Sequence, residues 1–255
     1  MKWARCVWCV LFGAVFFAWG DAIAASFLIR GSADTMSGFV QYGRSNGSVG
    51  TNSAAPPTVQ VDNKFILQGV FEFSLAPLAA QGVSASDILS ATLELTVYTV
   101  SLSSSNLLQL YDLADAQEDG SLTSGDYNAT ATRLDQSDVG ASGQNLQAGD
   151  VYARDVTAAV KADINANPGG YGADWTGFLL RWWNQSATLF DKISFYRRTD
   201  SPVTVQPTLH VETIAVPEPG AGGLALVGGV LAGGLVVAGK CERRSRRRRH
   251  ARQPK

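Results

Sequence analysis

The chain has 255 residues, is 45% hydrophobic and carries a formal net charge of -1. The charge is unevenly distributed: residues 25–215 hold ten Lys and Arg against nineteen Asp and Glu, whereas nine of the 21 basic residues follow Gly239. The central region is acidic, contains none of the three cysteines and is long enough for one core, so the sequence argues against a nucleic-acid partner, a disulfide framework and Cys–His chemistry.

The first predicted element is an apolar segment at the N-terminus. Two basic residues precede an uncharged run over residues 6–19, and Ala22-Ile23-Ala24 matches the small-x-small pattern before a signal-peptide cleavage site. We therefore expect residues 1–24 to be a secretory signal peptide and the mature chain to start at Ala25.

The central region is predicted to form mainly β-strands. Over residues 64–75, Phe71 and Phe73 share one face and Glu72 lies on the other, and residues 88–102 alternate in the same way. Further strands are expected over residues 26–31, 107–113, 176–183, 189–197 and 208–212.

One helix is expected in the central region. Asp155 can cap a helix over residues 156–164, which ends before the turn Pro168-Gly169-Gly170. Residues 38–53, rich in Gly, Ser and Asn, are expected to form loops and weak strands. Many strands, turns between them and one short helix predict a mainly β fold. We expect residues 25–215 to form a β-sandwich of jelly-roll type. An apolar segment near the end of the sequence, residues 221–239, is expected to add a C-terminal transmembrane helix.

A candidate metal site lies in an acidic segment. Asp112, Asp115, Glu118, Asp119 and Asp126 place five carboxylates within fifteen residues, enough oxygen ligands for Ca²⁺ if the loop folds back on itself. The spacing differs from that of an EF-hand loop, and a solvated acidic turn is the alternative interpretation. No other cofactor is indicated.

Tryptophans are the candidate ligand-binding side chains. Outside the predicted signal peptide only Trp175, Trp182 and Trp183 remain. In a strand, Trp182 and Trp183 point to opposite faces and Arg181 shares the face of Trp183, so one Trp is expected in the core and its neighbour at the surface. Trp175, Arg181 and Trp183 are therefore candidates for stacking on a sugar ring, with packing against the sheet as the alternative.

The central region contains few of the histidine and cysteine side chains that commonly act in catalysis. His210 is its single histidine, so a Ser-His-Asp triad would depend on that residue and a zinc site lacks ligands. The sequence contains no nucleophile-elbow, Walker or dinucleotide-binding motif. We expect no enzymatic activity. The alternative is a carboxylate-dependent glycoside hydrolase, because nineteen acidic residues always include some pair at a suitable separation.

The last 40 residues have three parts. Val216-Pro217-Glu218-Pro219-Gly220 comes first, residues 221–239 are small and apolar, and residues 240–255 are strongly basic. Nineteen helical residues span about 28 Å, close to the roughly 30 Å of a bilayer core. The basic cluster is expected to stay in the cytoplasm as a tail, which places residues 25–215 on the outer side of the membrane.

This arrangement resembles the PEP-CTERM sorting signal of exported proteins in Gram-negative bacteria. The resemblance implies that Val216, Pro217, Glu218 and Pro219 are the sorting motif and that the membrane protease exosortase is the processing partner. It implies a precursor anchored transiently in the inner membrane and a product at the cell surface or outside the cell. The alternative is a Pro-rich linker before a permanent single-span anchor.

The central region shows a second resemblance. Ala91-Thr-Leu93-Glu-Leu95, Asp155-Val156-Thr157, Gly177-Phe178-Leu179-Leu180 and Pro207-Thr-Leu209-His-Val211 occur in an order similar to that of DNRLRE-type domains, which are related to a carbohydrate-binding jelly-roll family. The Arg-rich signature of those domains is not clearly present, and Lys64-Phe-Ile-Leu67 stands near its expected place. With the sorting signal, this resemblance implies a cell-envelope or extracellular-matrix protein with a structural or weak carbohydrate-binding role associated with exopolysaccharide.

Overall fold

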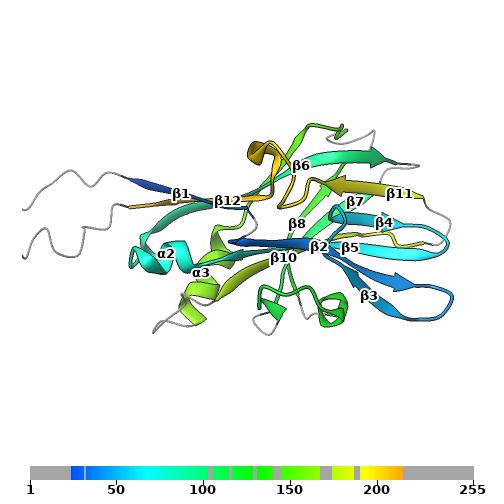
Figure 1. Cartoon of the computed structure of the whole chain (residues 1–255), viewed down its shortest axis with the longest axis horizontal. Coiled ribbons are helices and arrows are strands. Elements are labelled where there is room, and N and C mark those ends of the chain that lie inside the picture. Colours follow the sequence, from blue (N-terminus) through cyan, green and yellow to red (C-terminus); the bar gives the residue numbers. More distant parts are fainter. Residues whose placement is uncertain are drawn as a thin grey trace, which may run out of the picture. The chain divides into compact units, whose positions relative to one another are not determined.

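The structure, a computed structural model, describes most of the central region (Figure 1). The described residues are 24–31, 33–102, 106–114, 117–128, 131–139, 145–166, 174–186 and 190–214. The predicted signal peptide, apart from its last residue, and the predicted sorting signal lie outside them. Among the described residues, no helix combines the length and the apolar character needed to cross a membrane.

The described part of the chain is mainly β-structure. Its strands are β1 (Ala25–Arg30), β2 (Thr35–Gly43), β3 (Val49–Asn52), β4 (Thr58–Val61), β5 (Phe65–Ser74), β6 (Ile88–Ser101), β7 (Leu107–Asp112), β8 (Thr132–Asp138), β9 (Val151–Asp155), β10 (Trp175–Trp182), β11 (Asp191–Phe195) and β12 (Thr208–Thr213). Its helices are α2 (Ala76–Ala80) and α3 (Thr157–Ala166), with 3-10 turns η1 (Ala85–Asp87), η3 (Ser124–Asn128) and η5 (Val203–Val205).

The strands that alternate most clearly in the sequence are confirmed. β5, β6, β7, β10, β11 and β12 lie where alternation predicted strands, β1 lies at the first predicted run, and α3 is the predicted helix. Residues 38–53 are more regular than expected, because β2 and β3 pair over Phe39 to Tyr42 as a hairpin. The sequence did not predict β4, β8 and β9.

The twelve strands form one curled antiparallel sheet. The strand order is β1-β12-β6-β11-β4-β5-β10-β7-β8, with β2 pairing with β5 and β3, and β9 pairing with β6. β6 is the longest strand: its first half pairs with β12 and β9, and its second half pairs with β11. β6 therefore connects the strands β12 and β9 to the strand β11, and the sheet is continuous around its core (Figure 1).

The main core lies inside the curl. It takes alternate side chains from β5, β10 and β7 and from β6, β12 and β9. Its bulkiest members are Trp182, Tyr152, Phe71, Phe73, Phe178 and Phe195. Trp182 is 2% exposed, and its indole N–H donates to the main-chain oxygen of Val59 at 3.2 Å. The prediction that one of the two adjacent tryptophans packs in the core is therefore confirmed.

A second apolar cluster lies on the opposite side of the same strands. The outer face is the face of β2, β5, β10 and β7 that is turned away from the main core. There Met36, Val40, Val70, Tyr111, Leu113 and Leu179 are buried together. Leu122 and Tyr127, from the segment 117–128, pack against this cluster. The segment therefore covers one end of the outer face, and the candidate site begins at its margin.

Candidate functional site

Trp183 is the exposed tryptophan that the sequence predicted. It directly follows β10, and its main-chain N–H donates to the oxygen of Leu107 at 2.8 Å, so the strand ladder continues to this residue. Its side chain therefore stands on the outer face with that of Arg181. Trp183 is 62% exposed. It presents an aromatic surface to solvent at one end of the outer face.

Trp175 lies at the other end of β10 and is partly buried. Its indole packs against the main chain of Gly120: a Cβ atom added to Gly120 would lie 2.5 Å from Trp175 Cε2. Eight residues of a strand span about 27 Å, so Trp175 and Trp183 do not form one stacking platform. The surroundings of Trp175 match packing within the protein better than stacking on a sugar ring.

Arg181 lies between these two tryptophans and is half-buried. Its guanidinium lies over the Tyr111 ring, 4.0 Å from the centroid, and Nη2 donates to the Tyr111 hydroxyl at 2.7 Å. That hydroxyl donates to Gln109 Oε1 at 2.8 Å, and Gln109 Nε2 donates to Gln136 Oε1 at 2.8 Å. Because each group holds the next, the guanidinium is fixed in place before any ligand arrives.

Gln68 of β5 lies beside Arg181 on the neighbouring strand. β10 pairs with β5 so that Leu180 is opposite Gly69, which places Gln68 next to Arg181 on the outer face. Gln68 is 3% exposed, and its Oε1 makes no hydrogen bond to any described residue. A buried amide oxygen of this kind is costly to leave without a donor. It offers an acceptor to an ordered water inside the protein.

Two tyrosines and a second arginine complete this group. Tyr127, from η3, stacks on Tyr42 of β2 with the ring centroids 5.5 Å apart and the planes 18° apart. Burial raises the pKa of Tyr127, Tyr42 adds to the increase, and Arg44 and Arg181 act against it, so both guanidiniums lie near the phenol. Arg44 Nε donates to the Asp62 main-chain oxygen at 2.8 Å.

We call this group the Arg181 patch. Its members are Arg181, Tyr111, Gln109, Gln68, Tyr42, Tyr127 and Arg44. It combines aromatic rings with hydrogen-bond donors and acceptors that are already oriented, and the exposed Trp183 adjoins it. Such a combination suits a ligand with both hydroxyl groups and apolar C–H faces, as sugars have. The sequence indicated Arg181 and Trp183 but gave no sign of the tyrosines and glutamines, which come from β2, β5, β7 and η3.

The predicted Ca²⁺ ligands separate into different places. Asp112 and Glu118 lie close together, and Asp163 of α3 lies close to both of them. Asp115 lies outside the described residues. Asp119 Oδ1 accepts the Ser121 main-chain N–H at 2.8 Å. Asp126 is buried and accepts the N–H and the hydroxyl of Thr123 at 2.7 and 3.1 Å.

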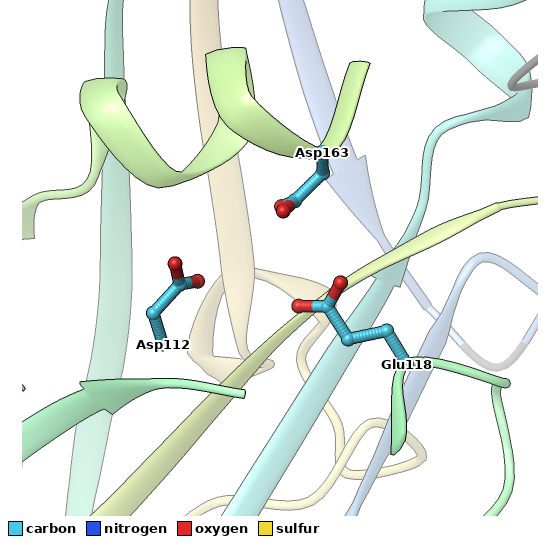
Figure 2. Close-up of side chains that lie close together, drawn as sticks. All are labelled: Asp112, Glu118 and Asp163. Atoms are coloured by element: carbon cyan, nitrogen blue, oxygen red, sulfur yellow. The ribbon is translucent and has the colours of Figure 1, made fainter. Parts of the chain in front are cut away.

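The carboxylates of Asp112, Glu118 and Asp163 point into one space between α3 and the end of β7 (Figure 2). Asp163 was not predicted here, yet the sequence contained a signal: in the predicted helix it lies three and four residues after Val160 and Ala159, on the buried side of the helix. A charged residue at such a position has to be accommodated inside the protein.

Glu72 is a further buried carboxyl group that sequence reasoning did not single out. It lies near the C-terminal end of β5 on the outer face and is 0% exposed. Its Oε2 accepts the Gly120 main-chain N–H at 2.6 Å. Burial raises the pKa of Glu72 to about 8; nearby Asp126 and Asp119 also raise it, and the Gly120 hydrogen bond acts in the opposite direction.

His210 lies in β12, as the sequence predicted. Its Nε2 and the Ser26 hydroxyl of β1 are 2.7 Å apart across the strand pair. This contact joins the two strands at the edge of the sheet.

The chain matches no protein-family model, and no curated protein matches its sequence significantly.

Proposed function

We propose that this is an exported, non-catalytic protein of the cell envelope or extracellular matrix that binds exopolysaccharide weakly through the Arg181 patch and Trp183. The observation that carries the proposal is the exposed Trp183 beside a pre-oriented guanidinium. A sugar ring can stack its C–H face on the indole while its hydroxyl groups reach the Arg181 guanidinium.

The composition of the patch supports a weak and polar mode of binding. The ring of Tyr42 is half-buried, Gln68 Oε1 is buried beneath the surface, and the donors on Arg181 are partly used by Tyr111. A face with one exposed indole buries little apolar area, so high affinity for a single sugar is not expected. Repeated sugars along a polymer, or several copies of the protein on one polymer, would raise the overall strength of binding.

The route of delivery rests on the two ends of the sequence. The proposal is that residues 1–24 direct export, that residues 221–239 hold the precursor in the inner membrane as a helix, and that exosortase acts near Pro217-Glu218-Pro219. The finer description of the fold, a jelly-roll β-sandwich like that of DNRLRE-type domains, belongs to the same proposal. A curled antiparallel sheet around one core supports it.

Binding is tested with the purified full-length protein on an array of bacterial polysaccharides and their oligosaccharides. The expected result is binding without release of reducing ends, weakened about tenfold by Trp183→Ala, since the loss of one ring contact is worth about 1 kcal/mol or more. The matched control is Tyr98→Ala, another exposed aromatic residue, on β6, which should bind as the wild type does. Equal binding by both variants would remove the role given to Trp183.

Release of reducing ends would favour the other candidate, a carboxylate-dependent glycoside hydrolase. In that case single Asp or Glu substitutions should abolish turnover.

The route is tested by the intact mass of the protein from its native host and from the same host without exosortase. A product that starts near Ala25 and ends between Pro217 and Gly220, formed when exosortase is present and missing in its absence, is expected. Retention of residues 221–255 in both hosts would contradict the sorting route and leave a permanently anchored single-span protein.

A further inference from the structure

The strongest unassigned feature is the group of three carboxylates between α3 and the end of β7. Asp112 is the last residue of β7, Glu118 lies in the segment after it, and Asp163 lies in the second half of α3. One oxygen atom from each of them lies within 4.8 Å of the other two. Figure 2 shows the three groups directed toward a common centre from three separate parts of the chain.

Two of these carboxylates are almost completely buried. Asp163 is 7% exposed and Glu118 is 9% exposed, while Asp112 is half-buried. Like charges held this close repel each other more strongly inside a protein than in water, because the effective dielectric constant is lower. The group therefore favours whatever brings positive charge to its centre, a proton or a cation.

The main chain positions Glu118 at this centre. β7 ends at Asp112, opposite Phe178, so on the β7 side β10 has no strand partner at Gly177, and the Gly177 N–H donates to Glu118 Oε1 at 2.6 Å. A Cβ atom added to Gly177 would lie 3.0 Å from Glu118 Cγ, so the absence of a side chain there gives the glutamate its room. The carboxylate is held in a fixed orientation by the sheet.

An independent observation concerns Thr176, a buried residue that is not acidic. Asp112 is paired with Phe178, so their side chains share one face of the sheet, and Thr176, two residues earlier on β10, lies on that face too. α3, which carries Asp163, packs on β10. Thr176 is fully buried, and its hydroxyl oxygen makes no hydrogen bond to any described residue. Thr176 is therefore a diagonal cross-strand neighbour of Asp112, on the same face of the sheet, and its hydroxyl oxygen has no partner among the described residues.

We propose that Asp112, Glu118 and Asp163, with the hydroxyl of Thr176, bind a divalent cation, and that this cation is Ca²⁺. The ligand atoms are all oxygen, the type that Ca²⁺ and Mg²⁺ take and that Zn²⁺ uses less than nitrogen or sulfur. Ca²⁺ binds oxygen at 2.3–2.6 Å, so oxygens up to about 5 Å apart can share one ion, whereas Mg²⁺ requires them within about 4.2 Å. The three oxygens lie within 4.8 Å of one another, a range that includes separations that one Ca²⁺ can bridge.

The proposed site is independent of carbohydrate binding. Asp112 and Thr176 face the main core, whereas the Arg181 patch lies on the outer face. Its role would be to hold α3 and Glu118 at the end of β7. It differs from the site expected from sequence alone, because Asp163 replaces the more distant members Asp119 and Asp126.

The test measures Ca²⁺ binding and unfolding with the full-length protein. Titration calorimetry with CaCl2 is expected to give a dissociation constant of about 0.1 to 1 mM. Thermal unfolding in 5 mM CaCl2 is expected to occur about 3 to 8 °C higher than in EDTA, with a smaller shift in MgCl2. Asp163→Asn should abolish the Ca²⁺ shift, and Asp119→Asn, the matched control in the same acidic segment, should retain it.

Thr176→Val keeps the proposal testable if a charge substitution prevents folding. It preserves the shape of the side chain and removes the hydroxyl, so the protein should fold, with an unfolding midpoint in EDTA at or above that of the wild type. It should bind Ca²⁺ about three- to tenfold more weakly. The proposal is overturned if wild-type protein shows no heat of binding and no shift with CaCl2, or if Asp119→Asn loses the shift and Asp163→Asn keeps it.

Discussion

Glu72 places an ionisable group where water does not reach it, near the C-terminal end of β5 beneath the segment 117–128. Its pKa is raised to about 8 by burial, from the usual value of 4.5. Between pH 4.5 and pH 8 the folded state therefore keeps a proton that the unfolded state has lost. The free energy of unfolding falls as the pH rises through this window, because the folded state binds more protons.

Glu72→Gln is therefore expected to stabilise the protein at pH 8 and to have little effect near pH 4.5. Glutamine resembles the protonated side chain and keeps the acceptor for the Gly120 N–H. The gain at pH 8 should be about 2 to 4 kcal/mol, and it should grow steadily between the two pH values. Urea unfolding at pH 5, 6.5 and 8 measures it. A gain of the same size at all three values would show that the carboxyl of Glu72 does not titrate in this range.

Gly120 has a backbone conformation that depends on the absence of a side chain. Its φ is +73°, in the left-handed region, and an added Cβ would lie 2.5 Å from Trp175 Cε2. Gly120→Ala should lower the free energy of unfolding by about 2 to 4 kcal/mol, because it adds backbone strain and displaces a packed indole. Gly50→Ala is the control: no atom lies within 4 Å of its added Cβ, and its stability should change by less than about 0.5 kcal/mol.

At the scale of elements, α3 begins at a turn that the sequence identified. Asp155 Oδ1 accepts the main-chain N–H of Thr157 at 2.9 Å and its hydroxyl at 2.6 Å. The hydroxyl and then the amide hold the pKa of Asp155 below its usual 3.8. The carboxylate therefore stabilises the fold above that pH and stops doing so as the pH falls through its lowered pKa.

Asp155→Ala should cost about 1 kcal/mol at pH 7, and Asp155→Asn much less, since asparagine also supplies an acceptor to the start of the helix. Guanidinium unfolding of the two variants at pH 7 compares them. If both lost the same amount, the charge of Asp155 and not its hydrogen bonds would be responsible.

The elements that the sequence missed share a physical reason. β8 pairs with β7 alone and alternates little between polar and apolar residues, so nothing in its pattern marks it as a strand. In β2, Gly38 reads as a loop residue, yet an added Cβ would lie 2.7 Å from the Asn52 oxygen, so the glycine serves a close approach between strands. In both β8 and β2, pairing with a neighbouring strand determines the strand conformation.

The candidate sites also contain residues that the sequence predicted and residues that it missed. The opposite faces of Trp182 and Trp183 follow from the period of a strand, and the sequence predicted them correctly. The meeting of Asp163 with Asp112 joins residues about fifty positions apart, which needs the packing of α3 on the sheet. The tyrosines and glutamines of the Arg181 patch depend on strand order, which alternation does not reveal.

At the scale of the whole described region, most strands of the curled sheet contribute to the main core. Trp182→Ala should therefore lower the free energy of unfolding by about 3 to 5 kcal/mol, whereas Trp183→Ala should change it by less than about 0.5 kcal/mol. Fluorescence and far-UV circular dichroism should report the same single transition, because the outer-face cluster lies on β5, β7 and β10, which also carry the main core. Separate transitions would indicate that the outer-face cluster melts independently.

β1 and β12 are neighbours at one edge of the sheet, with Ala25 directly opposite Thr213 (Figure 1). Paired residues of antiparallel strands lie about 5 Å apart, so a linker of a few residues would close the polypeptide into a ring. The ring could then be reopened at an exposed turn such as the one at Gly149. By the same geometry, the whole unit could be inserted as a guest into a surface loop of another protein, entering and leaving through adjacent positions.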